Sequence, residues 1–94
     1  MDDLVFLQQW FSAHCDEDWE HGEGIKLISL DNPGWSLEVD LRGTGFEGRS
    51  MPRVKAERSE TDWTQAWSDG RKFHAVGGAG NLVEVIGHFR AFVR

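Results

Sequence analysis

The sequence predicts an α+β fold: one helix, a four-stranded antiparallel sheet and a second helix, with both helices packed on one face of the sheet. Two observations predict the helices, because apolar side chains recur with the helical period in residues 3–14 and 82–93. A third predicts the sheet, since residues 35–41 alternate between apolar and polar side chains. No repeat, linker or low-complexity tract interrupts the 94 residues, so residues 1–94 are predicted to form a single domain.

The first helix is predicted over residues 3–14, with Asp2 or Asp3 capping its first turn. A polar segment, residues 16–24, then ends the helical pattern. The predicted inward stripe of this helix is Leu4, Leu7, Phe11 and His14, widened by Phe6 and Trp10.

Two strands, residues 25–30 and 35–41, are predicted to follow as a hairpin. The second strand is expected to turn four side chains toward the core: Trp35, Leu37, Val39 and Leu41.

The connection between these strands sets their register. Pro33 and Gly34 suit the central positions of a type II turn, and a four-residue loop is the alternative. Because the two loop lengths differ by an even number of residues, both place Ile28 and Leu30 on the core face.

The C-terminal half is predicted to contain a glycine-rich loop at residues 43–51 and two weaker strands at residues 53–58 and 62–68. Their expected inward residues are Val54, Ala56, Trp63 and Trp67. A short apolar segment, Phe73 to Val76, precedes the glycines.

The last helix has the clearest signal. Asn81 suits its N-cap, and Glu84 stands three residues later, at the spacing of a capping box. The helix is expected to lie across the hairpin, and one core is predicted to contain Leu37, Val39, Ile86 and Phe89.

The charge of −6 is unevenly distributed. Residues 1–41 contain ten acidic side chains and one basic one, whereas residues 42–94 contain nine basic and six acidic ones. An acidic surface repels nucleic-acid phosphates and attracts basic partners, so no nucleic-acid partner is expected. The densest acidic patch comprises Asp16, Glu17, Asp18, Glu20 and Glu23.

The compartment is predicted to be the cytoplasm. Cys15 is the only cysteine, so no intramolecular disulfide can form. The acidic start, Met1 to Asp3, is unlike a signal peptide, and no apolar run approaches the roughly 20 residues of a membrane helix.

One group of side chains contains every residue type that zinc accepts: His14, Cys15, Asp16, Asp18, Glu20 and His21. No second ligand pair appears downstream, so neither a metal nor another cofactor is expected. Cys15 with His14 or His21 could form a nucleophile and its base, but spacing supplies neither an oriented base nor an oxyanion site. We therefore expect no enzymatic activity.

The glycine-rich segment Gly77 to Gly80 precedes a helix, as anion-binding loops do. It lacks the Gly-Lys-Ser/Thr ending of a phosphate-binding loop, so a flexible connection to Asn81 is the preferred prediction.

Three motifs occur in order: Cys15-Asp16-x-Asp18-Trp19-Glu20-His21, Gly24-Ile25-Lys26, and Leu30-Asp31-Asn32-Pro33-Gly34-Trp35. These motifs resemble those of the immunity protein 53 family of bacterial polymorphic toxin systems. The rest of the chain resembles the same family in its helical segments Leu7 to Phe11 and Leu82 to Phe89, its Asp62-Trp63 strand, Phe73 and the glycine loop. Two positions depart from the pattern: Glu17 replaces a small residue and Ala79 an acidic one.

The resemblance implies an immunity protein that binds and neutralises a cognate toxin. We expect the acidic patch of Asp16, Glu17, Asp18, Glu20 and Glu23 to steer a basic toxin onto the protein. The second candidate surface is the open face of the sheet, which bears Glu38 and Asp40.

Three alternatives remain at this point. Trp19 could be buried beneath the acidic patch, with Glu20 bound to backbone or His21. The chain could be a small enzyme or metal-binding domain that uses the cluster from His14 to His21, or it could be a generic interaction module.

Overall fold

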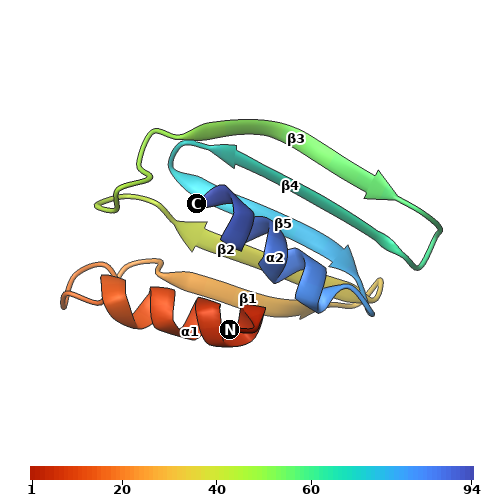
Figure 1. The fold of residues 1–94 in the computed structure, drawn as a ribbon, viewed down its shortest axis with the longest axis horizontal. Helices are drawn as coiled ribbons and strands as arrows, with labels where there is room; N and C mark the ends of the chain where they lie inside the picture. The colour runs from red at the N-terminus through yellow and green to blue at the C-terminus, as the bar shows by residue number, and fades with distance from the viewer.

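A computed structural model describes residues 1–94 and contains two helices and five strands (Figure 1). The elements are α1 (Asp3–His14), β1 (Ile25–Leu30), β2 (Gly34–Asp40), β3 (Ser50–Glu57), β4 (Trp63–Asp69), β5 (Lys72–Gly78) and α2 (Leu82–Phe92). The sheet is antiparallel throughout, in the order β1-β2-β5-β4-β3. The α+β class is confirmed, but the predicted number of four strands is wrong.

The unpredicted strand is β5, which lies in the middle of the sheet between β2 and β4. Its last residues, Gly77 and Gly78, lie within the strand rather than in a flexible loop or an anion-binding turn. A Cβ atom on Gly77 would lie 2.8 Å from Cγ2 of Val85, and one on Gly78 would lie 2.5 Å from the Thr61 carbonyl oxygen. These glycines therefore allow close packing, a role that a glycine-rich sequence does not reveal by itself.

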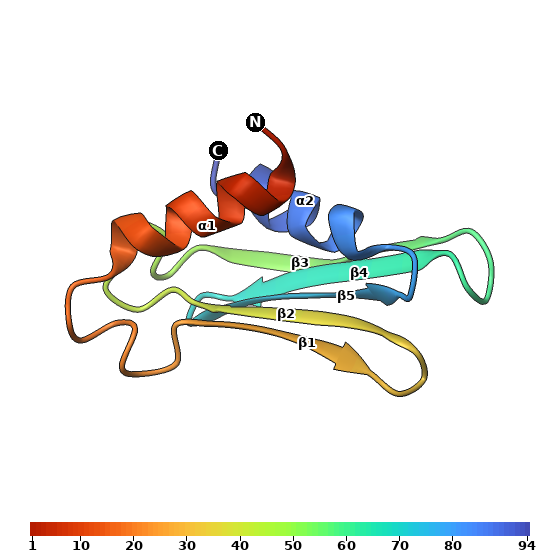
Figure 2. The same cartoon turned by 90° about the horizontal axis from the view of Figure 1, so that it is seen from below.

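Both helices lie on the same side of the sheet, and α2 contacts β2, β4 and β5 (Figure 2). Phe89 of α2 is completely buried, with its ring centroid 5.2 Å from that of Phe73 and 4.9 Å from that of Trp10. The four residues predicted to share a core all belong to one buried cluster: Leu37, Val39, Ile86 and Phe89. Neither helix is long and apolar enough to span a membrane.

The predicted register of the β1–β2 hairpin is wrong. Leu27 pairs with Leu37, so Leu27 faces the helices, whereas Ile28 faces the opposite side and is 57% exposed. Three residues connect the strands, and this odd number reverses the face of every β1 side chain relative to the two- and four-residue loops that were considered. Gly34 is part of β2, where the carbonyl oxygen of Gly77 leaves no space for a side chain.

Trp63 and Trp67 also lie on the open face, contrary to the prediction. Their neighbours Thr64, Ala66 and Ser68 face α2 and are buried. Helix α2 packs closely on β4, so small side chains occupy the face of β4 that contacts the helix, and the two tryptophan rings lie on the other side.

The predicted inward positions of β3 are only partly covered. Val54 and Ala56 pair with residues of β4 that face the helices, so both point to the helix side. Val54 is nevertheless 43% exposed, because β3 is the outer strand and α2 packs on β2, β4 and β5.

Helix α1 has the predicted bounds, and the Asp2 carboxylate accepts the N–H of Val5 at 2.8 Å. Its buried face differs from the predicted stripe. Leu7 and Trp10 are buried, whereas Leu4 and Phe11 are 63% and 37% exposed.

Candidate functional site

The acidic patch forms a loop, residues 16–23, that is held together by two of its own carboxylates. Oδ1 of Asp16 accepts the N–H groups of Asp18 and Trp19, both at 2.9 Å. The Glu20 carboxylate accepts the N–H groups of Asp16 and Glu17, both at 2.8 Å. Each carboxylate therefore satisfies two backbone donors and stabilises the loop, which we call the acidic loop.

These hydrogen bonds favour the charged form of both side chains. The N–H groups of Trp19 and Asp18 lower the pKa of Asp16 below its usual range. The pKa of Glu20 is lowered by its own N–H and by those of Asp16 and Glu17. Both carboxylates thus remain ionised at neutral pH while they serve the fold.

Trp19 attaches the acidic loop to the sheet. Its side chain is 8% exposed, and its indole N–H donates to the carbonyl oxygen of Asp40 at 3.0 Å. Its ring also packs edge-on against Trp10, with centroids 5.8 Å apart. Trp19 therefore lies beneath the acidic side chains, and Glu20 is bound to backbone, as one of the sequence-based alternatives described.

The remaining acidic side chains of the loop differ in their freedom. Glu23 forms an ion pair with Lys72 at 2.5 Å, and this hydrogen bond lowers the pKa of Glu23. Glu17 and Asp18 are exposed and form no ion pair. Their carboxylates form no ion pair and no hydrogen bond within the protein, so they are free to contact a partner directly.

The second candidate surface contains one accessible carboxylate rather than two. Asp40 is only 5% exposed and forms an ion pair with Arg42 at 3.2 Å. Burial alone would raise the pKa of Asp40, but the hydrogen bonds from Arg42 outweigh it and the pKa is lowered. Glu38 lies 3.5 Å from Nδ1 of His74 and is partly exposed.

A row of side chains that the sequence does not predict crosses the open face around Glu38. The Arg53 guanidinium lies 3.8 Å from the ring centroid of Trp67, and Trp67 stacks on His74 with centroids 4.9 Å apart. His74 then faces Glu38, whose register partner on β1 is Lys26. This row depends on β5, so no pattern in the sequence could have revealed it without that strand.

His14 and Cys15 are turned toward the backbone of α1. His14 stacks on Trp10 with centroids 3.8 Å apart, and its Nδ1 lies 2.8 Å from the Trp10 carbonyl oxygen. The Cys15 thiol donates to the carbonyl oxygen of Phe11 at 3.2 Å. Desolvation and the nearby carboxylates of Glu20 and Asp16 raise the pKa of Cys15, which disfavours the nucleophilic thiolate. No three His, Cys, Asp or Glu side chains come together as a metal site.

Comparison with known proteins identifies the family. A family model described as immunity protein 53 matches residues 4–94. This chain belongs to the immunity protein 53 family. The resemblance seen in the sequence motifs is therefore confirmed, although no curated protein and no solved structure matches the chain.

In this immunity protein 53 member, the sequence motifs on which the resemblance was based have structural roles. Trp19 and Glu20 hold the acidic loop, as described above. The indole N–H of Trp35 donates to the carbonyl oxygen of Ala79 at 2.9 Å, which attaches β2 to the end of β5. Gly34 allows the backbones of β2 and β5 to approach closely.

Glu17 has an unusual backbone conformation. It is the only residue other than glycine with a positive φ, at 79°. Glycine adopts this conformation without the steric cost that a Cβ atom adds. The conformation of Glu17 is therefore costly, which makes the presence of glutamate at this position notable.

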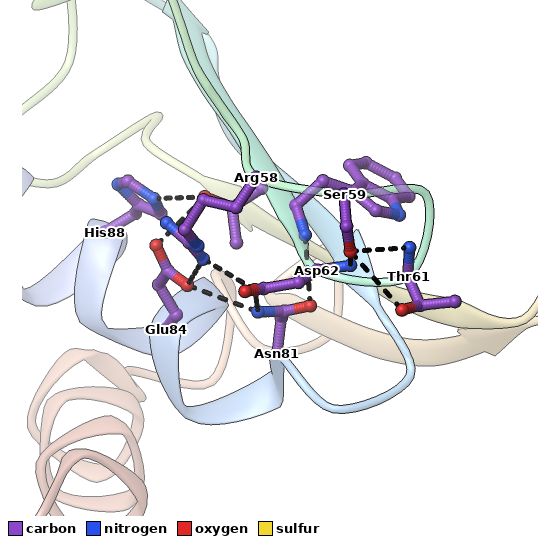
Figure 3. Close-up of polar contacts among 9 residues, drawn as sticks. Arg58, Ser59, Thr61, Asp62, Asn81, Glu84 and His88 are labelled. Carbon is purple, nitrogen blue, oxygen red and sulfur yellow. Dashed lines mark hydrogen bonds and ion pairs between the residues drawn. The ribbon is translucent and has the colours of Figure 1, made fainter.

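A second polar cluster joins the β3–β4 loop to α2, and we call it the Arg58 corner (Figure 3). Arg58 donates to the carboxylates of Asp62 at 2.9 Å and Glu84 at 2.5 Å. Asn81 donates to Asp62 at 2.9 Å and accepts the N–H of Trp63 at 3.3 Å. Asn81 occupies the N-cap position, but its side chain bonds to the neighbouring loop and strand, so the predicted capping box is wrong.

Proposed function

We propose that this protein is an immunity protein that binds a cognate toxin and neutralises it by steric and electrostatic blockade. The family match over residues 4–94 carries this proposal. Blockade requires a complementary surface and no reactive groups, so it agrees with a His14 and Cys15 that are bound to the α1 backbone. We accordingly propose that the protein is not an enzyme.

We place the first contact with the toxin at the acidic loop, with Glu17 and Asp18 as the directly contacting carboxylates. Asp16 and Glu20 add to the negative field while they remain bound to backbone N–H groups, whereas Lys72 offsets the charge of Glu23. The conformation of Glu17 supports this role, because costly backbone conformations tend to be retained where function requires the residue. Such a field attracts a basic partner and accelerates its association.

Co-expression with the toxin encoded beside this chain tests the function. Bacteria that produce the toxin should survive when the wild-type chain is present, and the two proteins should purify together. Death of these cells at full expression of the chain would reject neutralisation of that toxin.

A pair of double variants tests the surface. Glu17→Lys with Asp18→Lys should slow association by about tenfold or more at low salt, since charge mainly affects the on-rate. The matched control, Glu57→Lys with Glu60→Lys, makes the same change in charge around the β3–β4 loop, at the other end of the molecule (Figure 1). Equal on-rates for both variants would move the interface away from the acidic loop, first to the open face around Glu38.

A further inference from the structure

The two outer strands of the sheet differ in how they are protected from pairing with another chain. Strand β3 contains Pro52, exposed Arg53 and Lys55, and an irregular register between Met51 and Val54. Proline, charge and bulges are the features that prevent an edge strand from accepting a further strand. Strand β1 contains no proline and no bulge, and Lys26 is its only charged residue.

The outer edge of β1 presents a regular row of backbone groups. The Asp40 N–H donates to the carbonyl oxygen of Gly24 at 2.8 Å, which makes these two residues a hydrogen-bonded pair. Hydrogen-bonded and non-hydrogen-bonded pairs alternate along antiparallel strands. It follows that Ile25, Leu27 and Ser29 direct their N–H and C=O groups away from β2, toward the edge where no strand is paired.

Apolar side chains lie on both sides of this edge. Helix α1 runs along the β1 side of the sheet, on the helix-bearing face (Figures 1 and 2). Its exposed residues Leu4 and Phe11 are seven positions apart and so share one side of the helix. Phe11 reaches the start of β1, because its ring lies 3.8 Å from where a Cβ atom of Gly24 would be. On the open face, Ile28 is 57% exposed.

The charges around β1 indicate what kind of strand fits there. The acidic loop directly precedes β1, and Asp31 directly follows it, so both ends of the edge are acidic. We propose that the outer edge of β1 accepts an extended segment of the toxin as a sixth strand, with an apolar centre and basic residues at both ends. This inference rests on the proposed function and names the part of the partner that is bound.

The same charges argue against a second copy of this chain as the occupant. Two β1 strands paired antiparallel across a twofold axis would bring each acidic loop beside Asp31 of the other copy. Like charges brought together in this way disfavour the pairing.

Proline substitution at Ser29 tests the edge, since the Ser29 N–H points outward and is not needed by β2. We expect Ser29→Pro to weaken toxin binding at least tenfold, with unchanged circular dichroism. The matched variant Ser29→Ala keeps the N–H and should bind like the wild type.

Amide hydrogen exchange, measured by NMR on the wild-type protein, supplies a second test that needs no variant. In the free protein, the amides of Ile25, Leu27 and Ser29 should exchange much faster than those of Lys26 and Ile28. With bound toxin, the three outward amides should become protected.

The outcomes separate this inference from the proposed function. Absence of wild-type binding overturns both. Wild-type binding with equal affinity for Ser29→Pro overturns only the edge inference, as does a complex that leaves the three amides unprotected. Sedimentation could instead show that the wild type is a dimer and Ser29→Pro a monomer. That result would place a second copy of this chain on the edge and overturn the inference. If Ser29→Pro is unfolded, the amide protection decides.

Discussion

At one end of the molecule, the carboxylates of Asp16 and Glu20 accept hydrogen bonds from uncharged backbone N–H groups. At the other end, those of Asp62 and Glu84 accept hydrogen bonds from the Arg58 guanidinium (Figures 1 and 3). Both arrangements stabilise ionised acids, but only the second one sets a positive charge against them. The acidic loop can therefore support the fold and still project negative charge, whereas Arg58 offsets part of the negative charge of Asp62 and Glu84.

The largest expected effect concerns the attachment of the acidic loop. Trp19→Ala removes a buried ring and should lower the free energy of unfolding by about 3–5 kcal/mol. Trp19→Phe keeps much of the apolar contact but loses the hydrogen bond to Asp40, so it should cost about 1–2 kcal/mol. Urea denaturation measures both. Equally small changes in the free energy of unfolding for the two variants would mean that Trp19 does not hold the acidic loop in place.

Loss of the uncharged Asn81 side chain from the Arg58 corner should lower the free energy of unfolding. Asn81 is buried, and Asn81→Ala leaves the half-buried Trp63 N–H without its partner, which should cost about 1–3 kcal/mol. Asn32→Ala, at an exposed position in the β1–β2 connection, serves as the control and should change stability by less than about 0.5 kcal/mol. Similar melting temperatures for the two variants would show that the corner adds little to the fold.

The sequence predicts the elements that local patterns decide, and it fails where packing between distant residues decides the structure. The bounds of α1 follow from its cap and apolar residues, and the alternation of β2 places Leu37 and Val39 correctly. Strand β5 was missed because Gly77 and Gly78 resemble a loop, although they serve the contact with α2. The hairpin register failed because the number of loop residues, not their type, decides which face Ile28 occupies.

The sequence predicts where the acidic side chains gather, but only partly predicts how each of them is bound. The density of acidic residues points to the loop, but it cannot separate Asp16, which binds backbone, from Asp18, which is exposed without an ion pair. The inclusion of Asp40 was misleading, since Arg42 and burial remove it from the surface. The row from Arg53 to Glu38 requires four strands in the correct order and so has no local signature.

A smaller effect of opposite sign is expected at Glu17. Glycine adopts a positive φ without the cost that a Cβ atom adds, so Glu17→Gly should stabilise the protein by about 0.5–1 kcal/mol. Asp18→Gly, at the neighbouring position without a positive φ, should not stabilise. If Glu17 contacts the toxin, Glu17→Gly will also slow association. A stabilised variant with wild-type association kinetics would separate the conformation of Glu17 from toxin binding.

The smallest effects concern how the stability contributed by the acidic loop and by the Arg58 corner changes with pH. They test the difference between these two regions most directly. The pKa values of Asp16, Glu20, Asp62 and Glu84 are all lowered by their partners. A carboxylate whose pKa is lower in the folded protein stabilises the fold above its unfolded pKa, which is about 4, and this contribution is lost as the pH falls through the folded value. Wild-type stability should therefore decline below about pH 4.

Two isosteric double variants divide that decline between the ends. Asp16→Asn with Glu20→Gln removes titration from the acidic loop, and Asp62→Asn with Glu84→Gln removes it from the Arg58 corner. Each should make the loss of stability at low pH shallower than in the wild type.

At neutral pH, about 1 M salt shortens the screening length to about 3 Å, which should reduce the cost of the corner variant because ion pairs are screened. The cost of the loop variant should change less, since short hydrogen bonds to backbone N–H groups hold its carboxylates. Urea denaturation at low and high salt measures both costs. An equal effect of salt on the two variants would show that backbone-bound and arginine-bound carboxylates do not differ electrostatically. The electrostatic role proposed for the acidic loop depends on that difference.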